Sequence, residues 1–416
     1  MTLRTIFGPF YILASLTGIL IPVEKRWPLW KKILTYIPSV IWLILFLTRG
    51  IYLTFKFQQS ETLTKYWCYV VPCFFFMIHA QICTPTLIFL KKTHFLQTFI
   101  DDLTKVSHKM LVPVSAKALI LCGIFMVVYL FTGVALCIEN LFTYKPDNTL
   151  ISNASASLAD VQKLLSNLQP TELMPTTLSD TIARYMLALQ NYRGIMLFGQ
   201  AVFPLDIFII ISGAYVSSVT MVIFFLAING ISTSYEKFNK EIKTAINERK
   251  FEKNLSCLTE IENRLTAYQK LADTIYLAFG TLMSTTFMFG IIIHGAAQFA
   301  MRAYSDNMYI PERVVFVSWT GFGLILIVLS LNRPTRFYKE TIETKEILWQ
   351  ESSLFSNSNE LLVPKLERIR SRIDDASYGR HMMISVKLSL FSIKAFLFII
   401  MFTIDILVAF WKRTNL

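Results

Sequence analysis

The chain has 416 residues, of which 54% are apolar and only 16% are charged, and its mean hydropathy is +0.50. A soluble globular protein carries about 25% charged residues, so this composition excludes a soluble enzyme and indicates a surface that mostly faces lipid. The net charge of +12 could suggest a nucleic-acid-binding protein. The basic residues lie between apolar blocks, however, which is typical of membrane topology. We therefore expect a lipid bilayer around the chain and no nucleic-acid partner.

Seven apolar segments are long enough to cross a bilayer, for which about 20 residues are needed. They are Ile33–Phe55, Trp67–Leu90, Ala118–Ile138, Ile195–Ile231, Leu271–Met301, Val314–Leu331 and Leu388–Trp411. For the fourth segment we expect one long helix that projects beyond the membrane, because two spans would need an implausibly tight turn. Ile6–Pro22 is apolar but short, so we predict that it forms a re-entrant or interfacial helix.

The density of Lys and Arg alternates along the chain and predicts its orientation. The segments rich in Lys and Arg hold 28 of these residues in total and are 1–32, 91–117, 230–272 and 332–387. The poor segments, with 10, are 55–66, 139–194, 297–313 and 412–416. Loops rich in Lys and Arg stay cytoplasmic, so the N-terminus is predicted to be cytosolic and, after seven crossings, the C-terminus extracellular. The sequon at Asn153 then lies outside and is a candidate glycosylation site.

These boundaries predict an all-α polytopic membrane protein with six parts. The parts are a cytosolic N-terminus (1–32), helices 1–4 with a long extracellular loop at 139–194 (33–231), cytosolic helices leading into helix 5 (232–270), helices 5 and 6 (271–331), cytosolic anchor helices (332–387), and helix 7 with an extracellular tail (388–416).

Two cytosolic stretches have helical apolar periodicity. The first continues without a break into the fifth span, and its seam is Leu258, Ile261, Leu265, Tyr268, Ala272 and Ile275. The second is Leu362, Leu366, Ile369 and Ile373, with Arg368, Arg370 and Arg372 on other faces. A basic amphipathic helix of this kind can lie on anionic lipid. We favour packing of the two seams against each other and against neighbouring subunits, because a seam continuous with a span cannot lie flat on the bilayer.

The sequence contains no HExxH, GxSxG or Walker motif, so we expect neither enzymatic activity nor a cofactor or metal. The outer halves of several spans are instead rich in aromatic residues with a few polar ones, which suits a small apolar ligand, although an interfacial aromatic belt has the same composition. The candidate ligand-binding residues are Tyr69, Phe75, Phe125, Tyr129, Thr132, Gln200, Phe203, Phe316, Trp319 and Thr320.

Ionisable residues within spans are functional candidates by default. We expect His79 to be a hydrogen-bonded packing residue and Arg49 to extend outward to the interface. Asp206 has a ligand contact and a helix cap as alternatives, and Asp405, which is about 200° round the helix from Leu407, is expected to face a neighbouring helix. A disulfide between Cys68 and Cys137 near the outer face is a further alternative.

Two stretches carry a resemblance to the insect odorant receptor family that covers the whole chain. Leu258–Leu282, LTEIENRLTAYQKLADTIYLAFGTL, is similar to that family's pattern, with Leu265 where a histidine commonly stands. The final span, LSLFSIKAFLFIIMFTIDILVAFWK, is similar to the family's ending. It keeps Thr403 but has Ile404 and Phe410 where gustatory receptors and the shared co-receptor have tyrosine and glutamine. This ending resembles a ligand-tuning odorant receptor.

The resemblance implies a ligand-gated, non-selective cation channel in the plasma membrane of sensory neurons, assembled as a heterotetramer with co-receptor subunits. The ligand would be a small volatile hydrophobic odorant. The resemblance places Leu407 at the gate of the pore, with Thr403, Phe410 and Trp411 as further pore residues. Because Phe410 and Trp411 are bulky and apolar, we expect the co-receptor to supply most of the permeation surface. One alternative is a gustatory-type channel. The other is a G-protein-coupled receptor, and the charge pattern argues against this second alternative.

Overall fold

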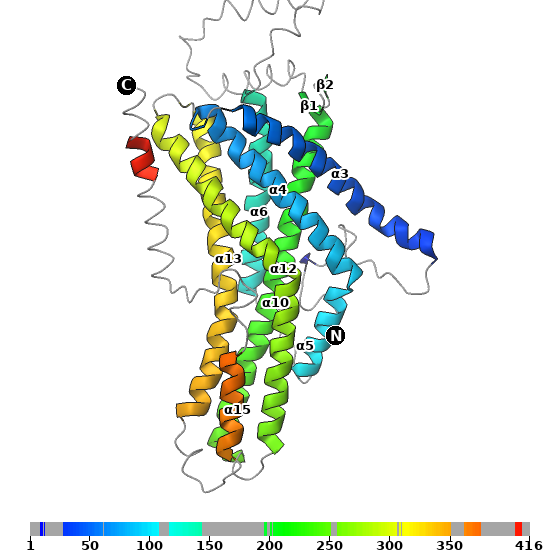
Figure 1. Ribbon diagram of the computed structural model, residues 1–416, viewed down its shortest axis with the longest axis vertical. Helices are drawn as coiled ribbons and strands as arrows, with labels where there is room; N and C mark the ends of the chain where they lie inside the picture. The colour runs from blue at the N-terminus through cyan, green and yellow to red at the C-terminus, as the bar shows by residue number, and fades with distance from the viewer. Residues whose placement is uncertain are drawn as a thin grey trace, which may run out of the picture.

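The computed structural model of the chain is a bundle of long helices with one short β-hairpin (Figure 1). It describes residues 9, 10, 12, 28–60, 62–107, 116–143, 195–197, 200, 201, 203–250, 256–305, 308, 310–350, 362–375 and 404–409. The helices are α3 (Leu29–Gln59), α4 (Lys65–Lys92), α5 (Phe95–Val106), α6 (Ala116–Thr143), α10 (Phe203–Asn247), α12 (Ser256–Ala303), α13 (Ile310–Gln350) and α15 (Leu362–Asp375). The antiparallel strands are β1 (Ile195–Leu197) and β2 (Gln200–Ala201), and residues 404–409 are helical.

Six helices in the described part of the chain are long and apolar enough to cross a membrane. They correspond to the first six spans expected from the sequence. The seventh, Leu388–Trp411, lies outside the described residues except for 404–409, and the interfacial helix expected at Ile6–Pro22 is likewise almost wholly outside them.

The fourth span begins later than the sequence suggested. Residues 195–201, expected to be helical, contain the strands of the hairpin, and α10 starts at Phe203. The physical reason is Pro204, the second residue of α10, because in the first turn of a helix the missing N–H of a proline costs no hydrogen bond and its fixed φ suits the helix start. From there α10 is one uninterrupted helix of 45 residues, as expected, and spans about 68 Å at 1.5 Å per residue.

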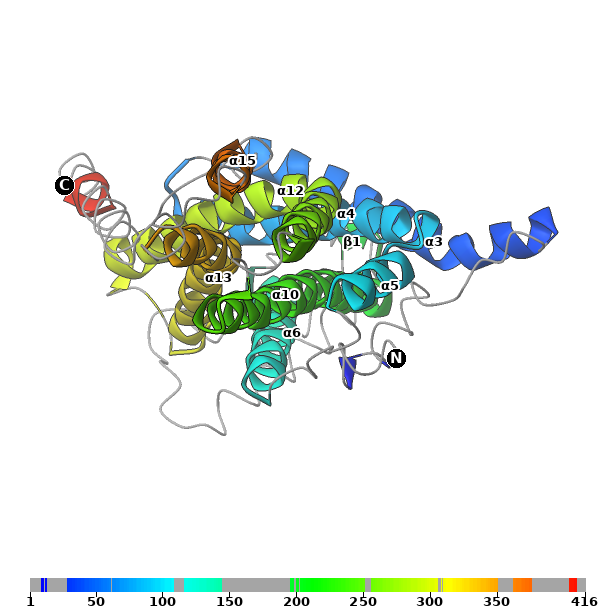
Figure 2. The same ribbon diagram turned by 90° about the horizontal axis from the view of Figure 1, so that it is seen from below.

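The helices α10, α12 and α13 run the length of the molecule, whereas α3, α4 and α6 flank only its upper part (Figure 1). Near the lower ends of the long helices, α15 lies alongside α12 and α13 (Figures 1 and 2). We call this lower part, residues 232–247, 256–270, 332–350 and 362–375, the stalk. It is formed by the segments that the sequence assigned to the cytosol.

Both predicted apolar seams are buried at every position whose side chain the structure describes, which leaves out Leu362. Every residue of the first seam, from Leu258 to Ile275, is buried in α12. On α15, Leu366, Ile369 and Ile373 are buried, and the helix packs on α12 and α13 of its own chain. Arg368 on α15 forms an ion pair with Glu262 of α12 at 3.1 Å. The seam of α15 therefore packs against helices of its own chain, as we favoured, while its packing against neighbouring subunits stays a prediction.

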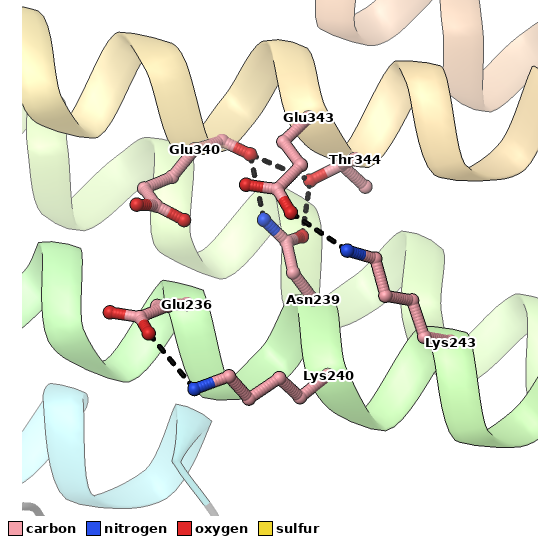
Figure 3. A network of polar contacts seen from close by, with 7 residues as sticks. All are labelled: Glu236, Asn239, Lys240, Lys243, Glu340, Glu343 and Thr344. Carbon is pink, nitrogen blue, oxygen red and sulfur yellow. Dashed lines mark hydrogen bonds and ion pairs between the residues drawn. The ribbon is translucent and has the colours of Figure 1, made fainter.

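A polar network connects α10 with α13 inside the stalk (Figure 3). The Asn239 amide donates to the carbonyl oxygen of Glu340 (2.8 Å), and the Thr344 hydroxyl donates to Asn239 Oδ1 (2.6 Å). Both Asn239 and Thr344 are buried. On the surface of the same contact, Lys243 pairs with Glu343 at 2.9 Å. Since an unpaired buried polar group is costly, these contacts fix how the two helices align.

Two flanking helices expose apolar side chains that a soluble protein would bury. On α3 these include Ile41, Ile44 and Ile51, and on α6 they include Ile120, Ile124, Val127 and Phe131, all at least 49% exposed. Continuous apolar surface of this kind requires a non-aqueous neighbour, and its position on helices of membrane-spanning length identifies that neighbour as lipid.

The segments rich in Lys and Arg gather at one end of the bundle. The Lys91 amine donates to the carbonyl oxygen of Thr35 (2.6 Å), which brings the start of α3 to the end of α4. The Arg264 guanidinium donates to the carbonyl oxygen of Val106 (3.2 Å), which joins the end of α5 to the stalk. The stalk itself contains the other two basic segments. The described parts of the four basic segments therefore lie toward the same end of the bundle, as the alternating charge pattern predicts.

Candidate ligand-binding site

Three of the predicted ligand-binding residues form a buried aromatic cluster between α4 and α13, at the end opposite the stalk. Phe316 and Trp319 are one turn apart on α13 and so share a face, with their ring centroids 5.4 Å apart. Tyr69 of α4 lies 4.7 Å from Phe316 and 6.2 Å from Trp319. All three side chains are buried. We call these three residues the outer cluster.

A second layer of rings lies further along the same two helices. Tyr129 of α6 lies 4.7 Å from Phe322, 5.5 Å from Phe125 and 5.6 Å from Phe76, centroid to centroid. Phe76 and Phe322 follow Tyr69 and Trp319 by whole helical turns, so the two layers form one column between α4, α6 and α13. We call Phe76, Phe125, Tyr129 and Phe322 the inner cluster. Its members Phe125 and Tyr129 are candidates from the sequence, whereas Phe322 was not predicted.

The other predicted ligand-binding residues are distributed around this column. Phe75 packs on Phe289 of α12 at 5.2 Å. Thr132 is buried, and its hydroxyl donates to the carbonyl oxygen of Val128 in its own helix (2.9 Å). Thr320 follows Trp319 on α13. Gln200 and Phe203 lie on β2 and at the first position of α10, and their side chains are outside the description.

His79 forms a polar link beside the inner cluster, in agreement with its expected packing role. The hydroxyl of Thr286 donates to the carbonyl oxygen of Leu282 (2.6 Å), and its oxygen lies 2.9 Å from His79 Nε2. Because that hydroxyl has a single proton, His79 donates from Nε2, and its Nδ1 accepts from the Tyr129 hydroxyl. The link connects α4, α6 and α12, and its hydrogen bonds are satisfied without a ligand.

A close helix crossing lies next to both clusters. A Cβ atom added to Gly323 of α13 would lie 2.7 Å from the carbonyl oxygen of Gly290 and 2.7 Å from the backbone nitrogen of His294, both on α12. Small residues allow membrane helices to approach in this way. Phe289 and Phe322 are the neighbours of these glycines, so the crossing determines where both rings lie. The imidazole of His294 donates from Nδ1 to the carbonyl oxygen of Thr320 (3.0 Å).

The predicted pore residues are only partly described. Leu407 belongs to the helical segment 404–409 and is exposed. Thr403, Phe410 and Trp411, and also the sequon at Asn153, lie outside the described residues. Asp405 forms an ion pair with Arg302 at the end of α12. Asp405 therefore contacts a neighbouring helix.

The structure corrects one expectation from the sequence and excludes one alternative. Arg49, expected to extend to the interface, is only 1% exposed, because its position on α3 faces the rest of the bundle. Cys68 is a buried free thiol, so the disulfide with Cys137 is not formed. Asp206 lies in the first turn of α10, with its side chain outside the description.

Comparisons with known proteins agree with this architecture. A family model described as "Caenorhabditis protein of unknown function, DUF267" matches residues 181–408. No curated protein sequence matches the chain. The fold is similar to that of the insect olfactory receptor OR5 from Machilis hrabei, with a TM-score of 0.63 at 12% identity over 97% of this chain and 98% of that one. The structure of the same receptor in complex with eugenol matches with a TM-score of 0.59 at 14% identity, over 98% of each chain.

Proposed function

Because this chain belongs to the DUF267 family and folds like an insect olfactory receptor, we propose that it is a subunit of a ligand-gated cation channel that detects a small, mostly apolar molecule. The observation that carries the proposal is the aromatic column between α4, α6 and α13. Its rings come from helices distant in sequence and lie in the half of the bundle away from the stalk. A ligand enclosed by such rings is held by shape and by few polar contacts.

The class of ligand is that of small volatile hydrophobic compounds. One of the similar structures is a complex with eugenol, a small aromatic molecule with polar substituents. Ligand binding shifts an equilibrium between closed and open states only if the ligand binds the open state more tightly. The rings of the aromatic column belong to different helices. The distances between the rings therefore change when the helices move between the closed and open states, and a ligand that fits the open spacing binds that state more tightly.

The proposed topology has seven spans with a cytosolic N-terminus and an extracellular C-terminus. The gathering of the basic segments at the stalk end supports this orientation. In this arrangement the seventh span, 388–411, lines a pore shared by four subunits, and the stalks assemble them. Asn153 is then extracellular, and the channel acts at the plasma membrane of a sensory neuron.

Partner subunits are part of the proposal. Phe410 and Trp411 stand at the pore-facing end of the last span, and four copies of such bulky apolar side chains would obstruct hydrated cations. A co-receptor with polar residues at these positions would supply the permeation surface of a heterotetramer, as the sequence resemblance implies.

The test is to record currents from cells that express the chain alone, an odorant co-receptor alone, or both, during application of a panel of volatile compounds. We expect compound-specific currents that require both subunits. Large currents from this chain alone would refute the heteromer, and no ligand-dependent current with any partner, despite surface expression, would refute the channel.

A matched pair of variants tests the site. Phe316→Leu removes a buried ring of the outer cluster, whereas Phe131→Leu removes a ring that is 51% exposed on the lipid-facing side of α6. We expect Phe316→Leu to change the order of effective compounds and Phe131→Leu to leave it unchanged. Unchanged dose–response curves for Phe316→Leu would place the ligand elsewhere.

A further inference from the structure

Trp319 holds a hydrogen-bond donor that nothing in the described part of the chain accepts. Its side chain is among the largest that are fully buried (0% exposed), and its indole Nε1 has no hydrogen-bond partner among the described residues. The ring packs in the outer cluster against Tyr69 and Phe316. An indole nitrogen can only donate, so the group needs an acceptor.

The hydroxyls on either side of Trp319 on α13 are also without a partner in the described structure. Elsewhere in the spans, Thr84, Thr132 and Ser330 donate to the carbonyl oxygen four residues earlier, the usual solution for hydroxyls in helices. The buried Oγ atoms of Ser318 and Thr320 have no such bond or any other in the described structure. Three consecutive residues of one helix thus keep polar atoms unpaired, beside an aromatic cluster.

An unpaired buried donor is destabilising, and in native proteins each such group calls for an explanation. The polar groups of the inner cluster need none, because the His79 link to Tyr129 and Thr286 is internally satisfied. The unpaired donor therefore distinguishes the outer cluster. A ligand with an acceptor oxygen would remove the penalty, and a hydrocarbon of the same shape would leave it.

We propose that the indole Nε1–H of Trp319 is the specificity-determining donor of the outer cluster and selects ligands that carry a hydrogen-bond acceptor, such as a carbonyl or ether oxygen, on an otherwise apolar body. This inference rests on the proposed binding function of the aromatic column and goes beyond it in naming the chemical group that the ligand must present. The hydroxyls of Ser318 and Thr320 add donors for ligands with a second oxygen.

The experiment measures binding of isosteric pairs to the full chain in lipid nanodiscs. Three pairs replace an oxygen by carbon with little change of shape: acetophenone and α-methylstyrene, cyclohexanone and methylenecyclohexane, anisole and ethylbenzene. Affinities are obtained from the rise in unfolding temperature with ligand concentration. The variant is Trp319→Phe, which keeps a ring and removes the N–H. The control is Trp30→Phe, which removes an indole N–H that is on an exposed side chain of α3.

We expect the oxygen-bearing member of a pair to bind at least about fivefold more tightly to the wild-type chain and to Trp30→Phe, and the preference to vanish in Trp319→Phe. Equal affinities within every pair, or a preference that persists in Trp319→Phe, would overturn the proposal while leaving a binding column in place. If no compound of any pair binds, the proposed function fails together with it.

A second measurement detects the hydrogen bond in the wild-type chain itself. With the tryptophan ring nitrogens labelled with nitrogen-15, one of the indole N–H resonances of the wild-type chain should move downfield on addition of acetophenone and stay in place with α-methylstyrene. The resonance is assigned to Trp319 by its absence from Trp319→Phe or Trp319→Tyr. An indole signal that moves equally with both compounds, or with neither, contradicts a hydrogen bond from Trp319.

Discussion

Arg302 at the end of α12 and Asp405 in the helical segment 404–409 form an ion pair that joins the bundle to the last predicted span. The same end of α12 is connected to the start of α4, because the Tyr304 hydroxyl donates to the carbonyl oxygen of Leu63 (2.7 Å). It is also connected through α13, since Glu312 pairs with Lys65 at 2.8 Å. The junction of α12 and α13 thus contacts both the side that holds Tyr69 and the proposed pore helix.

Neutralising either partner of this pair should alter gating. Arg302→Gln and Asp405→Asn each remove the ion pair while preserving side-chain size, so both should shift the half-maximal ligand concentration in the same direction. Asp405 is 61% exposed, and exposed pairs contribute at most about 1 kcal/mol, so we expect a shift of about two- to fivefold. Dose–response curves measure it.

The double variant separates a shared contact from two independent effects. If the ion pair is the cause, Arg302→Gln combined with Asp405→Asn should shift the curve no further than one substitution alone. Additive shifts would show that the two charges act separately. Lys65→Gln is the control. It also removes a positive charge from this end of the bundle, but the ion pair that it breaks is the one with Glu312 and not the one between Arg302 and Asp405.

A methyl group at Gly323 should destabilise the helix crossing. In Gly323→Ala the new Cβ would lie 2.7 Å from two backbone atoms of α12, so the helices must separate, at a cost of about 1–3 kcal/mol. Gly321→Ala is the matched control, because a Cβ there meets nothing within 4 Å. Thermal unfolding in nanodiscs should show a lower midpoint for Gly323→Ala. The control should be unchanged or slightly stabilised, since alanine favours helix over glycine. Equal midpoints for the two variants would contradict the crossing.

The features that the sequence predicted are those encoded within single segments. The seam from Leu258 to Ile275 has helical spacing over a long stretch, so its burial follows from periodicity alone. Apolar length defined the spans in the same way. At the fourth span, the apolar segment begins at Ile195, and the helix was predicted to begin there too. The position of Pro204 was not used, and the helix in fact begins at Phe203.

The features that the sequence did not predict depend on which helices meet. Tyr69, Phe316 and Trp319 were candidates because they are aromatic residues in the outer halves of predicted spans. Phe322, which contacts Tyr129, was not, because its place depends on the approach of α12 and α13 at two glycines 33 positions apart. One sequence contains no signal for such a pairing. A search for aromatic residues one turn from Trp319 would still have found Phe322.

The polar network of the stalk should contribute measurably to stability. Thr344→Val is nearly isosteric, but it removes the donor to Asn239 Oδ1 (2.6 Å) and leaves a buried amide oxygen without that bond. We expect a loss of about 1–3 kcal/mol in unfolding free energy. Thr274→Val is the control, because Thr274 is exposed and its hydroxyl donates only to its own helix, at Lys270. Denaturation of the purified protein measures both, and equal stabilities would show that the network is dispensable.

Arg264 should hold α5 against the stalk. Its guanidinium donates to the carbonyl oxygen of Val106 (3.2 Å), pairs with Glu241 at 2.6 Å and stacks 4.7 Å from the centre of the Phe238 ring. The carbonyl at the end of α5 lies at the negative end of the helix dipole, where a cation is stabilising.

Arg264→Lys keeps the charge but cannot make all three contacts, because the ammonium group lacks the planar fork of donors. We expect the last turn of α5 to open more readily and its amide hydrogens to exchange about 5- to 30-fold faster, which corresponds to a loss of about 1–2 kcal/mol in local stability. Hydrogen exchange followed by mass spectrometry measures the change. Arg313→Lys is the control, since Arg313 donates to Ser305 at the opposite end of the molecule. Unchanged exchange in α5 would mean that the apolar face of the helix, with Phe95, Phe99 and Leu103 buried, is sufficient to dock it.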